Sequence, residues 1–217
     1  MLSGGLDSAT TLYHAKDKGY QVLCLIFDYK QRHRKEIACA KKVAQASRSP
    51  FKVVPVSLPG TLSSLLNEKI RIPKRRGLPT ILKNQIPSTY VPARNIIFLG
   101  IAASWAETIG AQAIFIGANA RDYSGYPDCR PQFYKAFSKA LVQGMKASQE
   151  GRTIQIKTPL IRKTKAQIIK MGLGLKVPYH LTWSCYQGRK IPCGQCDSCL
   201  LREKGFQELK VKDPLLR

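Results

Sequence analysis

The stretch that decides the fold is Ser3-Gly4-Gly5-Leu6-Asp7-Ser8, because it places a paired-glycine turn directly before an apolar-periodic helix. The glycines let the backbone turn tightly with its N–H groups facing inward, and the helix that begins near Asp7 adds unpaired N–H donors and a positive dipole end. Neither the Gly-Lys-Ser/Thr ending of the common phosphate loop nor the three-glycine dinucleotide fingerprint is present. The stretch therefore predicts a polyphosphate site and indicates an enzyme that uses ATP.

The composition is that of a globular protein with a strongly basic balance. Hydrophobic residues make up 44% of the 217 residues, enough for a substantial core in one or two domains. No apolar run reaches the roughly 18 residues that a membrane span needs, so we expect no membrane association. Lys and Arg number 36 against 13 Asp and Glu, a net charge of +23 that attracts ATP and other anions. We do not expect a nucleic-acid partner, although the positive net charge does not exclude one.

Hydrophobic periodicity predicts alternating helices and strands, which is typical of a parallel sheet with crossover helices. The predicted helices are 7–18, 34–47, 95–109, one that begins near residue 131, and 163–171; the predicted strands are 21–28, 51–56, 113–117 and 154–158. Because residues 22–27 are apolar on both faces, we expect this strand at the centre of the sheet. The fold class is thus α/β, a doubly wound and mainly parallel sheet, in a domain of residues 1–177. Residues 178–217 are predicted to form a small metal-held lobe.

The phosphate loop begins at residue 3, where a doubly wound fold would have an entering strand in the middle of its sheet. Loss of that strand would leave two ladders of unpaired N–H and C=O groups. We therefore expect a start codon placed too far downstream rather than a compromised protein. Because the loop stands where a leader sequence would, we predict a cytoplasmic protein.

Four cysteines near the C-terminus have the spacing of a metal site. Cys193, Cys196 and Cys199 are each separated by two residues, and Cys185 stands eight positions upstream of the first. Four thiolates suffice for tetrahedral Zn²⁺, and closed four-cysteine sites are structural. An iron–sulfur cluster is the alternative, but ferredoxins with this spacing carry their fourth cysteine downstream, followed by proline. We expect one structural zinc that holds the C-terminal lobe.

Several blocks of the chain match known sequence signatures. The loop Ser3-Gly4-Gly5-Leu6-Asp7-Ser8 resembles the SGGxDS loop of the ATP pyrophosphatases, which cleave ATP between the α and β phosphates. The other blocks are Phe27-Asp28-Tyr29-Lys30-Gln31-Arg32-His33, Tyr90-Val91-Pro92-Ala93-Arg94-Asn95, Asp122-Tyr123-Ser124-Gly125-Tyr126-Pro127-Asp128-Cys129-Arg130-Pro131, and Thr182-Trp183-Ser184-Cys185-Tyr186 with 193–201. In this order, the blocks resemble the 7-cyano-7-deazaguanine synthases. Lys30 departs from the glycine that members of this family usually carry there.

The resemblance covers nearly the whole chain and implies an adenine nucleotide alpha hydrolase-like fold. It also implies a C–N ligase of queuosine precursor biosynthesis that converts 7-carboxy-7-deazaguanine and ammonia to 7-cyano-7-deazaguanine. ATP, with Mg²⁺, would activate first the carboxylate and then the amide intermediate as adenylates. Family members carry a four-cysteine zinc site and form homodimers, so the resemblance implies both here.

The loop and the resemblance together give the candidate site residues. The predicted ATP-binding residues are Leu2, Ser3, Gly4, Gly5, Leu6, Asp7, Ser8, Ala9, Thr10 and Arg94, of which Ser3, Asp7 and Ser8 are also predicted to be catalytic. The predicted substrate-binding residues are Gln31, Arg32, His33, Asp122, Tyr123, Tyr126, Asp128 and Arg130. Carboxylates would accept from a guanine-like edge, an aromatic ring would stack, and an arginine would pair with the carboxylate.

Some of these roles have alternatives. Asp7 either caps the helix or binds Mg²⁺, and Arg94 contacts a phosphate or forms a salt bridge at the start of its helix. His33 deprotonates ammonium, lies beside a phosphate, or is a solvated polar residue. The loop before residue 131 would, without a substrate role, be an Asp-capped turn.

Two other function classes compete with the ligase. A tRNA-thiolating ATP pyrophosphatase has a similar loop and would use the basic surface, but it needs a sulfur-carrying cysteine, for which Cys129 is the candidate. A non-catalytic, zinc-stapled RNA-binding module is the other alternative.

Overall fold

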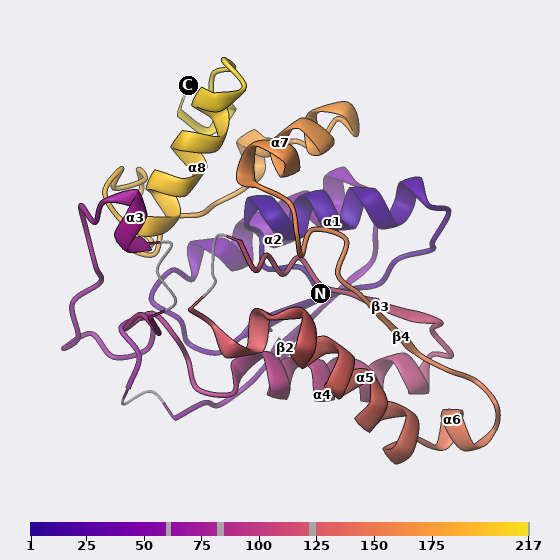
Figure 1. Ribbon diagram of the computed structural model, residues 1–217. Coiled ribbons are helices and arrows are strands. Elements are labelled where there is room, and N and C mark those ends of the chain that lie inside the picture. The colour runs from indigo at the N-terminus through magenta and orange to yellow at the C-terminus, as the bar shows by residue number, and fades with distance from the viewer. Residues whose placement is uncertain (60–61, 82–84, 122–124, 217) are drawn as a thin grey trace.

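The computed structural model describes residues 1–59, 62–81, 85–121 and 125–216. Its strands form two parallel pairs, β1 (Cys24–Asp28) with β2 (Phe51–Pro55), and β3 (Ala113–Phe115) with β4 (Gln155–Lys157). The N-terminus lies between the pairs (Figure 1), where the Met1 ammonium donates to Phe115 O at 2.8 Å and Leu2 N donates to Leu25 O at 2.8 Å. The first two residues therefore join the pairs where the central strand of a doubly wound sheet would run.

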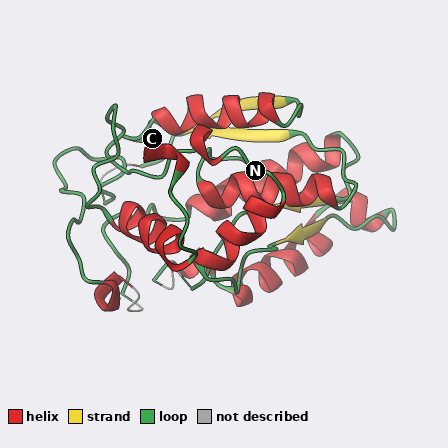
Figure 2. Ribbon diagram, turned by 90° about the horizontal axis from the view of Figure 1, so that it is seen from above, coloured by secondary structure: helices red, strands yellow, loops and turns green. Residues whose placement is uncertain are grey.

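Helices cover both faces of the strands (Figures 1 and 2). The longer ones are α1 (Leu6–Asp17), α2 (Lys35–Ala46), α4 (Arg94–Thr108), α5 (Pro131–Gly144), α7 (Lys165–Gly174) and α8 (Asp197–Glu208). The shorter ones are α3 (Leu78–Ile81), α6 (Lys146–Gln149) and the 3-10 turns Pro127–Cys129, Tyr179–Leu181 and Pro214–Leu216. Helices α1, α2 and α7 lie on one side of the strands and α4 and α5 on the other, so the predicted α/β fold is confirmed.

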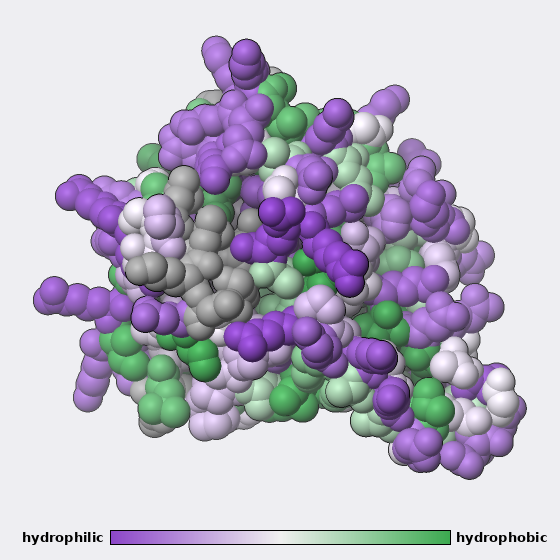
Figure 3. Space-filling model, viewed as in Figure 1, coloured by the Kyte–Doolittle hydropathy of each residue, from purple (hydrophilic) through white to green (hydrophobic). Residues whose placement is uncertain are grey.

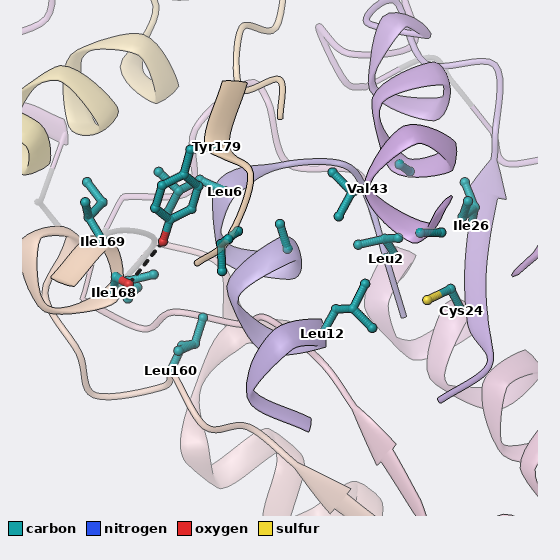
Figure 4. Close-up of a cluster of buried hydrophobic side chains, with 14 of the residues drawn as sticks. Leu2, Leu6, Leu12, Cys24, Ile26, Val43, Leu160, Ile168, Ile169 and Tyr179 are labelled. Atoms are coloured by element: carbon teal, nitrogen blue, oxygen red, sulfur yellow. Dashed lines mark hydrogen bonds between the residues drawn. The ribbon is translucent and has the colours of Figure 1, made fainter. Parts of the chain in front are cut away.

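Strand β1 is buried on both faces, as its apolar sequence predicts, and it pairs with β2 in a two-stranded sheet. Its successive side chains point to opposite faces, so Cys24 and Ile26 join one buried cluster while Leu25 and Phe27 join another. The first cluster packs α1, α2 and α7 against the sheet (Figure 4), and the second packs α4 and α5. A strand buried on both faces holds the loop that follows it rigidly, which matters because that loop belongs to the site.

The predicted elements agree with the observed ones to within a few residues, with two differences. The sequence of helix α4 is apolar nearly all round, which predicts a buried helix, but Ile96 is 45% exposed, so one face of the helix reaches the surface. Helix α8 was not predicted. It begins at Asp197, inside the cysteine run, and contains Gly205. A Cβ on Gly205 would come within 2.7 Å of the Lys165 and Ile169 side chains, so glycine lets α8 lie directly on α7.

The C-terminal segment shares a core with the rest of the chain. The Tyr179 hydroxyl lies 2.8 Å from Thr10 Oγ1 and donates to Ile168 O at 3.3 Å (Figure 4), and Phe206 packs in the same cluster. The division after residue 177 stays a prediction. Hydrophilic side chains cover much of the face in Figure 3, and within the described ranges no helix combines the length and apolarity that a membrane crossing requires.

Candidate active site

The phosphate loop is a tight turn pressed against α2. Gly4 has φ +86°, and a Cβ there would stand 2.3 Å from Glu36 O and 2.7 Å from Ala40 N. Only glycine therefore fits, both for its conformation and for the close approach. Gly5 is the N-cap of α1 and carries no side-chain cap, so the N–H groups at the start of α1 stay available to a ligand.

The two serines hold the shape of the loop. Ser8 Oγ donates to Gly5 O at 3.0 Å and lies 3.1 Å from Ser3 Oγ. Ser3 N donates to Ser8 Oγ at 3.2 Å, and Gly5 N donates to Ser3 Oγ at 3.3 Å. These bonds fix the turn before any ligand is present, so its donors are preorganised for an anion.

A cavity of about 230 Å³ opens beside this loop. It lies at the carboxyl ends of β1 and β3, where parallel sheets form their ligand sites. The residues that line it include the loop, the end of β1, the start of α4 and the cysteine-rich segment: Leu2, Ser3, Gly5, Leu6, Asp7, Ser8, Phe27, Tyr29, Gln31, His33, Glu36, Arg94, Asn95, Phe98, Gly117, Tyr126, Cys129, Lys165, Trp183, Ser184, Tyr186, Ser198 and Arg202. It thus combines a phosphate loop, cations and aromatic rings.

Most of the predicted ATP-binding residues meet at this cavity, and three do not line it. Gly4 lies against α2, and its carbonyl accepts a hydrogen bond from Trp183 N at 2.9 Å. Ala9 and Thr10 are buried in α1, and Thr10 Oγ1 donates to Leu6 O at 2.9 Å. These three residues support the loop from behind, and the ATP-binding set as a whole stays a prediction.

Asp7 lies in the first turn of α1 and forms an ion pair. Lys165 Nζ, from the first residue of α7, lies 2.7 Å and 2.8 Å from the two carboxylate oxygens. The N-cap residue of α1 is Gly5, so Asp7 is not the capping residue of this helix. The alternative role of Asp7, as a ligand of Mg²⁺, stays a prediction. Lys165 is only 9% exposed, so a lysine is buried at the edge of a phosphate site.

The predicted substrate residues divide into those at the cavity and those that support it. Gln31, His33 and Tyr126 line the cavity. Arg32 instead donates to the carbonyls of Ser64 and Ile70, at 3.2 Å and 3.1 Å, and so anchors the 62–72 segment.

The loop before α5 is likewise partly structural. Asp128 accepts a hydrogen bond from Asn95 N at 3.2 Å, at the start of α4, and Arg130 is the exposed N-cap residue of α5. Asp122 and Tyr123 lie outside the described residues. The substrate roles of all these residues stay predictions.

Arg94 and Cys129 lie side by side at the cavity wall. Burial opposes the charge of Arg94, but the neighbouring Tyr29, Cys129 and Asp128 groups more than offset this and raise its pKa, so it stays a cation. Burial, followed by the nearby Asp128, raises the pKa of the Cys129 thiol to about 12. Cys129 is therefore a protonated thiol at neutral pH, which does not suit a sulfur carrier.

Sequence reasoning missed Lys165 and Glu36. Lys165 follows Thr164, which forms a capping box with Gln167; this Thr-x-x-Gln pattern marks the start of α7 and so places Lys165 in its first turn. Glu36 stands three residues after His33, a spacing that puts the two side chains on one face at the start of α2. Both patterns can be recognised in the sequence, but neither indicates that Lys165 and Glu36 lie beside the phosphate loop.

The four cysteine sulfurs form one cluster, as their spacing predicts. The Sγ atoms of Cys185, Cys193, Cys196 and Cys199 all lie within 4.8 Å of one another. Tetrahedral Zn²⁺ with bonds of about 2.3 Å needs sulfur pairs roughly 3.8 Å apart, so the cluster fits this ion with small adjustments.

Backbone N–H groups support thiolates in this cluster. Cys193 N and Gln187 N donate to Cys185 Sγ, at 3.3 Å and 3.5 Å, and Cys196 N donates to Cys193 Sγ at 3.4 Å. Hydrogen bonds from the Cys196 and Cys199 thiols, and then those from the N–H groups of Cys193 and Gln187, lower the pKa of Cys185. Because Trp183, Ser184, Tyr186 and Ser198 line the cavity, an ion in the cluster would order one of its walls.

The chain has the α/β fold of the ATP pyrophosphatases, with a four-cysteine cluster that could hold a metal ion. Its fold is similar to that of NMN synthetase from Francisella tularensis (TM-score 0.50, 16% identity, 97% of this chain and 76% of that chain). The family model described as "Queuosine biosynthesis protein QueC" matches residues 1–210, and the chain belongs to this family.

Relatives in this family carry a common enzyme name. The chain is 52% identical over 208 residues to a 7-cyano-7-deazaguanine synthase of Picrophilus torridus, with 96% of this chain and 86% of that protein covered. It is 50% identical over 216 residues to the 7-cyano-7-deazaguanine synthase of Acetivibrio thermocellus, with 99% and 95% covered. The family resemblance read from the sequence blocks is therefore confirmed.

Proposed function

We propose that this chain is an ATP-dependent C–N ligase that converts 7-carboxy-7-deazaguanine and ammonia to 7-cyano-7-deazaguanine, in the biosynthesis of a queuosine precursor. The observation that carries the proposal is the preorganised phosphate loop at the mouth of a cavity lined by cations and aromatic rings, in a chain of this family. The loop suits a triphosphate, and the rings suit a planar heterocycle.

Conversion of a carboxylate to a nitrile removes both carboxylate oxygens, and neither leaves unaided at neutral pH. In the first half, the carboxylate attacks the α phosphate of ATP, pyrophosphate leaves, and ammonia displaces AMP to give the amide. In the second half, the amide oxygen is adenylated by another ATP, and loss of AMP and a proton gives the nitrile. Each half therefore needs the same phosphate site.

The residues of the chain have distinct roles in this scheme. The loop shaped by Ser3, Gly5 and Ser8 holds the departing pyrophosphate through the N–H groups at the start of α1, that of Ser8 included, and through the Ser3 hydroxyl. Lys165 lies beside Asp7 at the same loop and is placed to move from that carboxylate onto a phosphate, which would release Asp7 for Mg²⁺. Arg94 is a buried cation that pairs with either a phosphate or the substrate carboxylate.

Cys185, Cys193, Cys196 and Cys199 would hold one zinc ion. A closed four-cysteine site supplies structural stability rather than catalysis. The zinc site would support the function indirectly, because the neighbouring Trp183, Ser184 and Tyr186 form part of the cavity wall.

Assembly and location complete the proposal. A homodimer is supported by the resemblance and by exposed apolar side chains such as Ile96 and Val142, 45% and 39% exposed. A cytoplasmic location agrees with ATP as substrate and with reduced cysteines.

The experiment is ATP–pyrophosphate exchange with 7-carboxy-7-deazaguanine and Mg²⁺ in the absence of ammonium. The proposal predicts exchange that depends on the acid, because the first adenylation is reversible. Replacement of the acid by 7-deazaguanine, which lacks the carboxylate, is the matched control and should abolish the exchange. A protein that binds ATP but exchanges no pyrophosphate with the acid would contradict the proposal.

A further inference from the structure

The wall of the cavity contains a second carboxylate besides Asp7, and it has no role in the proposed adenylation steps. Glu36, in the first turn of α2, lines the cavity, and its side chain is 15% exposed. A carboxylate beside a phosphate loop repels a bound triphosphate unless a cation lies between them. Glu36 thus calls for a positively charged ligand of its own.

The space beside Gly5 is bordered by oxygen atoms. Apart from Gly5 and its two chain neighbours, the atoms nearest to the point where a Cβ would stand on Gly5 are three oxygens: Ser3 Oγ at 3.4 Å, Glu36 Oε1 at 3.6 Å and the carbonyl oxygen of Trp183 at 3.6 Å. A hydroxyl, a carboxylate and a carbonyl all accept hydrogen bonds. Such a set suits a small cation that carries N–H donors.

His33 fixes the orientation of this carboxylate. Its Nε2 lies 3.0 Å from Glu36 Oε2, so Oε1 is the oxygen that faces Gly5. The other ring nitrogen, Nδ1, is buried and has no hydrogen-bond partner among the described residues. A proton on Nδ1 would therefore be buried without an acceptor, which favours the imidazole that carries its proton on Nε2 and donates to Glu36. Glu36 Oε2 then accepts the hydrogen bond from His33, and Oε1 is the oxygen that can accept from a ligand.

We infer that Glu36 binds ammonium beside the phosphate loop and takes up its first proton, with His33 as the residue that positions it. The inference rests on the proposed function, which consumes ammonia at the adenylated carboxylate. Ammonia is mostly ammonium at neutral pH, so the reaction needs both a site for the cation and an acceptor for its proton. Glu36 provides both at the loop where the adenylate forms.

Formation of the amide removes two protons from ammonium. Ammonium gives one proton to Glu36 Oε1, and the lone pair so released forms the C–N bond to the acyl carbon. The bond from that carbon to the AMP oxygen breaks, and its electron pair leaves with AMP. The second proton lost from nitrogen passes to the departing AMP phosphate, and the amide remains.

The test separates adenylation from amide formation in Glu36→Gln. This variant keeps the size of the side chain but not its charge. We expect pyrophosphate exchange without ammonium to be kept or raised, because the carboxylate no longer repels the triphosphate, while kcat/KM for ammonium in amide formation falls about 100-fold, the lower range for general acid–base catalysis. Hydroxylamine, which is largely unprotonated at neutral pH, should form the hydroxamate with both proteins at similar rates.

Further variants test the role of His33 and control for the change of charge. His33→Ala should raise KM for ammonium, and His33→Gln, which keeps an N–H donor, should restore part of the loss. Glu208→Gln makes the same change on an exposed face of α8 and should alter neither reaction.

The outcomes are distinct. Unchanged ammonium kinetics in Glu36→Gln would overturn the inference. So would a parallel loss of pyrophosphate exchange with a raised Mg²⁺ requirement, because Glu36 would then be a ligand of the nucleotide's magnesium. If the unchanged protein itself shows no exchange, the proposed function fails, and this inference fails with it.

Discussion

The close approach of the phosphate loop to α2 leads to a quantitative prediction for Gly4→Ala. Gly4 has φ +86°, a conformation that costs an alanine about 1–2 kcal/mol. The new Cβ would also stand 2.3 Å from Glu36 O, and because backbone atoms on a packed helix cannot move aside cheaply, overpacking adds about 1–3 kcal/mol.

The expected loss of stability is thus about 3 kcal/mol, from the sum of these two costs. For a protein of this size, that lowers Tm by about 6–12 °C. Gly19→Ala is the matched control: its φ is +80°, but its Cβ would have nothing within 4 Å, so only the conformational cost remains.

The assay is thermal unfolding of both variants, followed by circular dichroism, together with ATP–pyrophosphate exchange. Gly4→Ala should unfold well below Gly19→Ala and should exchange no pyrophosphate, because the loop cannot keep its shape. Equal Tm values for the two variants would refute the reasoning, since they would show that the loop does not press on α2.

Other predictions concern the ion pair, the cysteine cluster and Cys129. Lys165→Met should lower kcat/KM for ATP about tenfold or more by loss of a charged hydrogen-bond donor, while Lys170→Met on the exposed face of α7 should not; equal kinetics would remove Lys165 from the phosphate site. Cys196→Ser should lower both the Tm and the zinc content, the latter measured by inductively coupled plasma mass spectrometry, whereas Cys39→Ser should keep the zinc. A full zinc content in Cys196→Ser would contradict the four-cysteine site. The pKa of the Cys129 thiol is about 12 in the folded protein, and its ordinary value is 9.0. Because the folded protein holds this proton more tightly, the contribution of Cys129 to the free energy of unfolding is complete below pH 9 and is lost as the pH rises towards 12. The fall in Tm over this range should therefore be shallower in Cys129→Ser, and an unchanged slope would contradict the raised pKa.

The parts of the fold that the sequence predicts are those with a local signal. The paired glycines and the periodicity that follows them locate α1, and the apolar run 22–27 predicts a strand buried on both faces, which β1 is. Cysteine spacing predicts the cluster of four sulfurs, because two-residue separations bring sulfurs together within a short turn. Helix α8 was not predicted, because its first turn lies within the cysteine spacing pattern and because Gly205 is unfavourable in a helix. The same glycine allows the close contact with α7.

The site was less predictable, because its partners come from elements far apart in the chain. Lys165 meets Asp7 only because α7 packs beside α1, and Glu36 meets the loop only because Gly4 lets α2 come close. Asp128 shows the opposite case: a carboxylate in a substrate-like loop accepts a hydrogen bond from the start of α4 instead. No pattern in a single segment distinguishes these roles.

The most direct test of the central claim is mass spectrometry of the products formed from 7-carboxy-7-deazaguanine, ammonium, Mg²⁺ and ATP. The account predicts the nitrile, preceded by the amide, with AMP and pyrophosphate released in equal amounts at each of the two steps. Nitrile formation with ADP and phosphate, or no product from a folded protein with its metal in place, would contradict it.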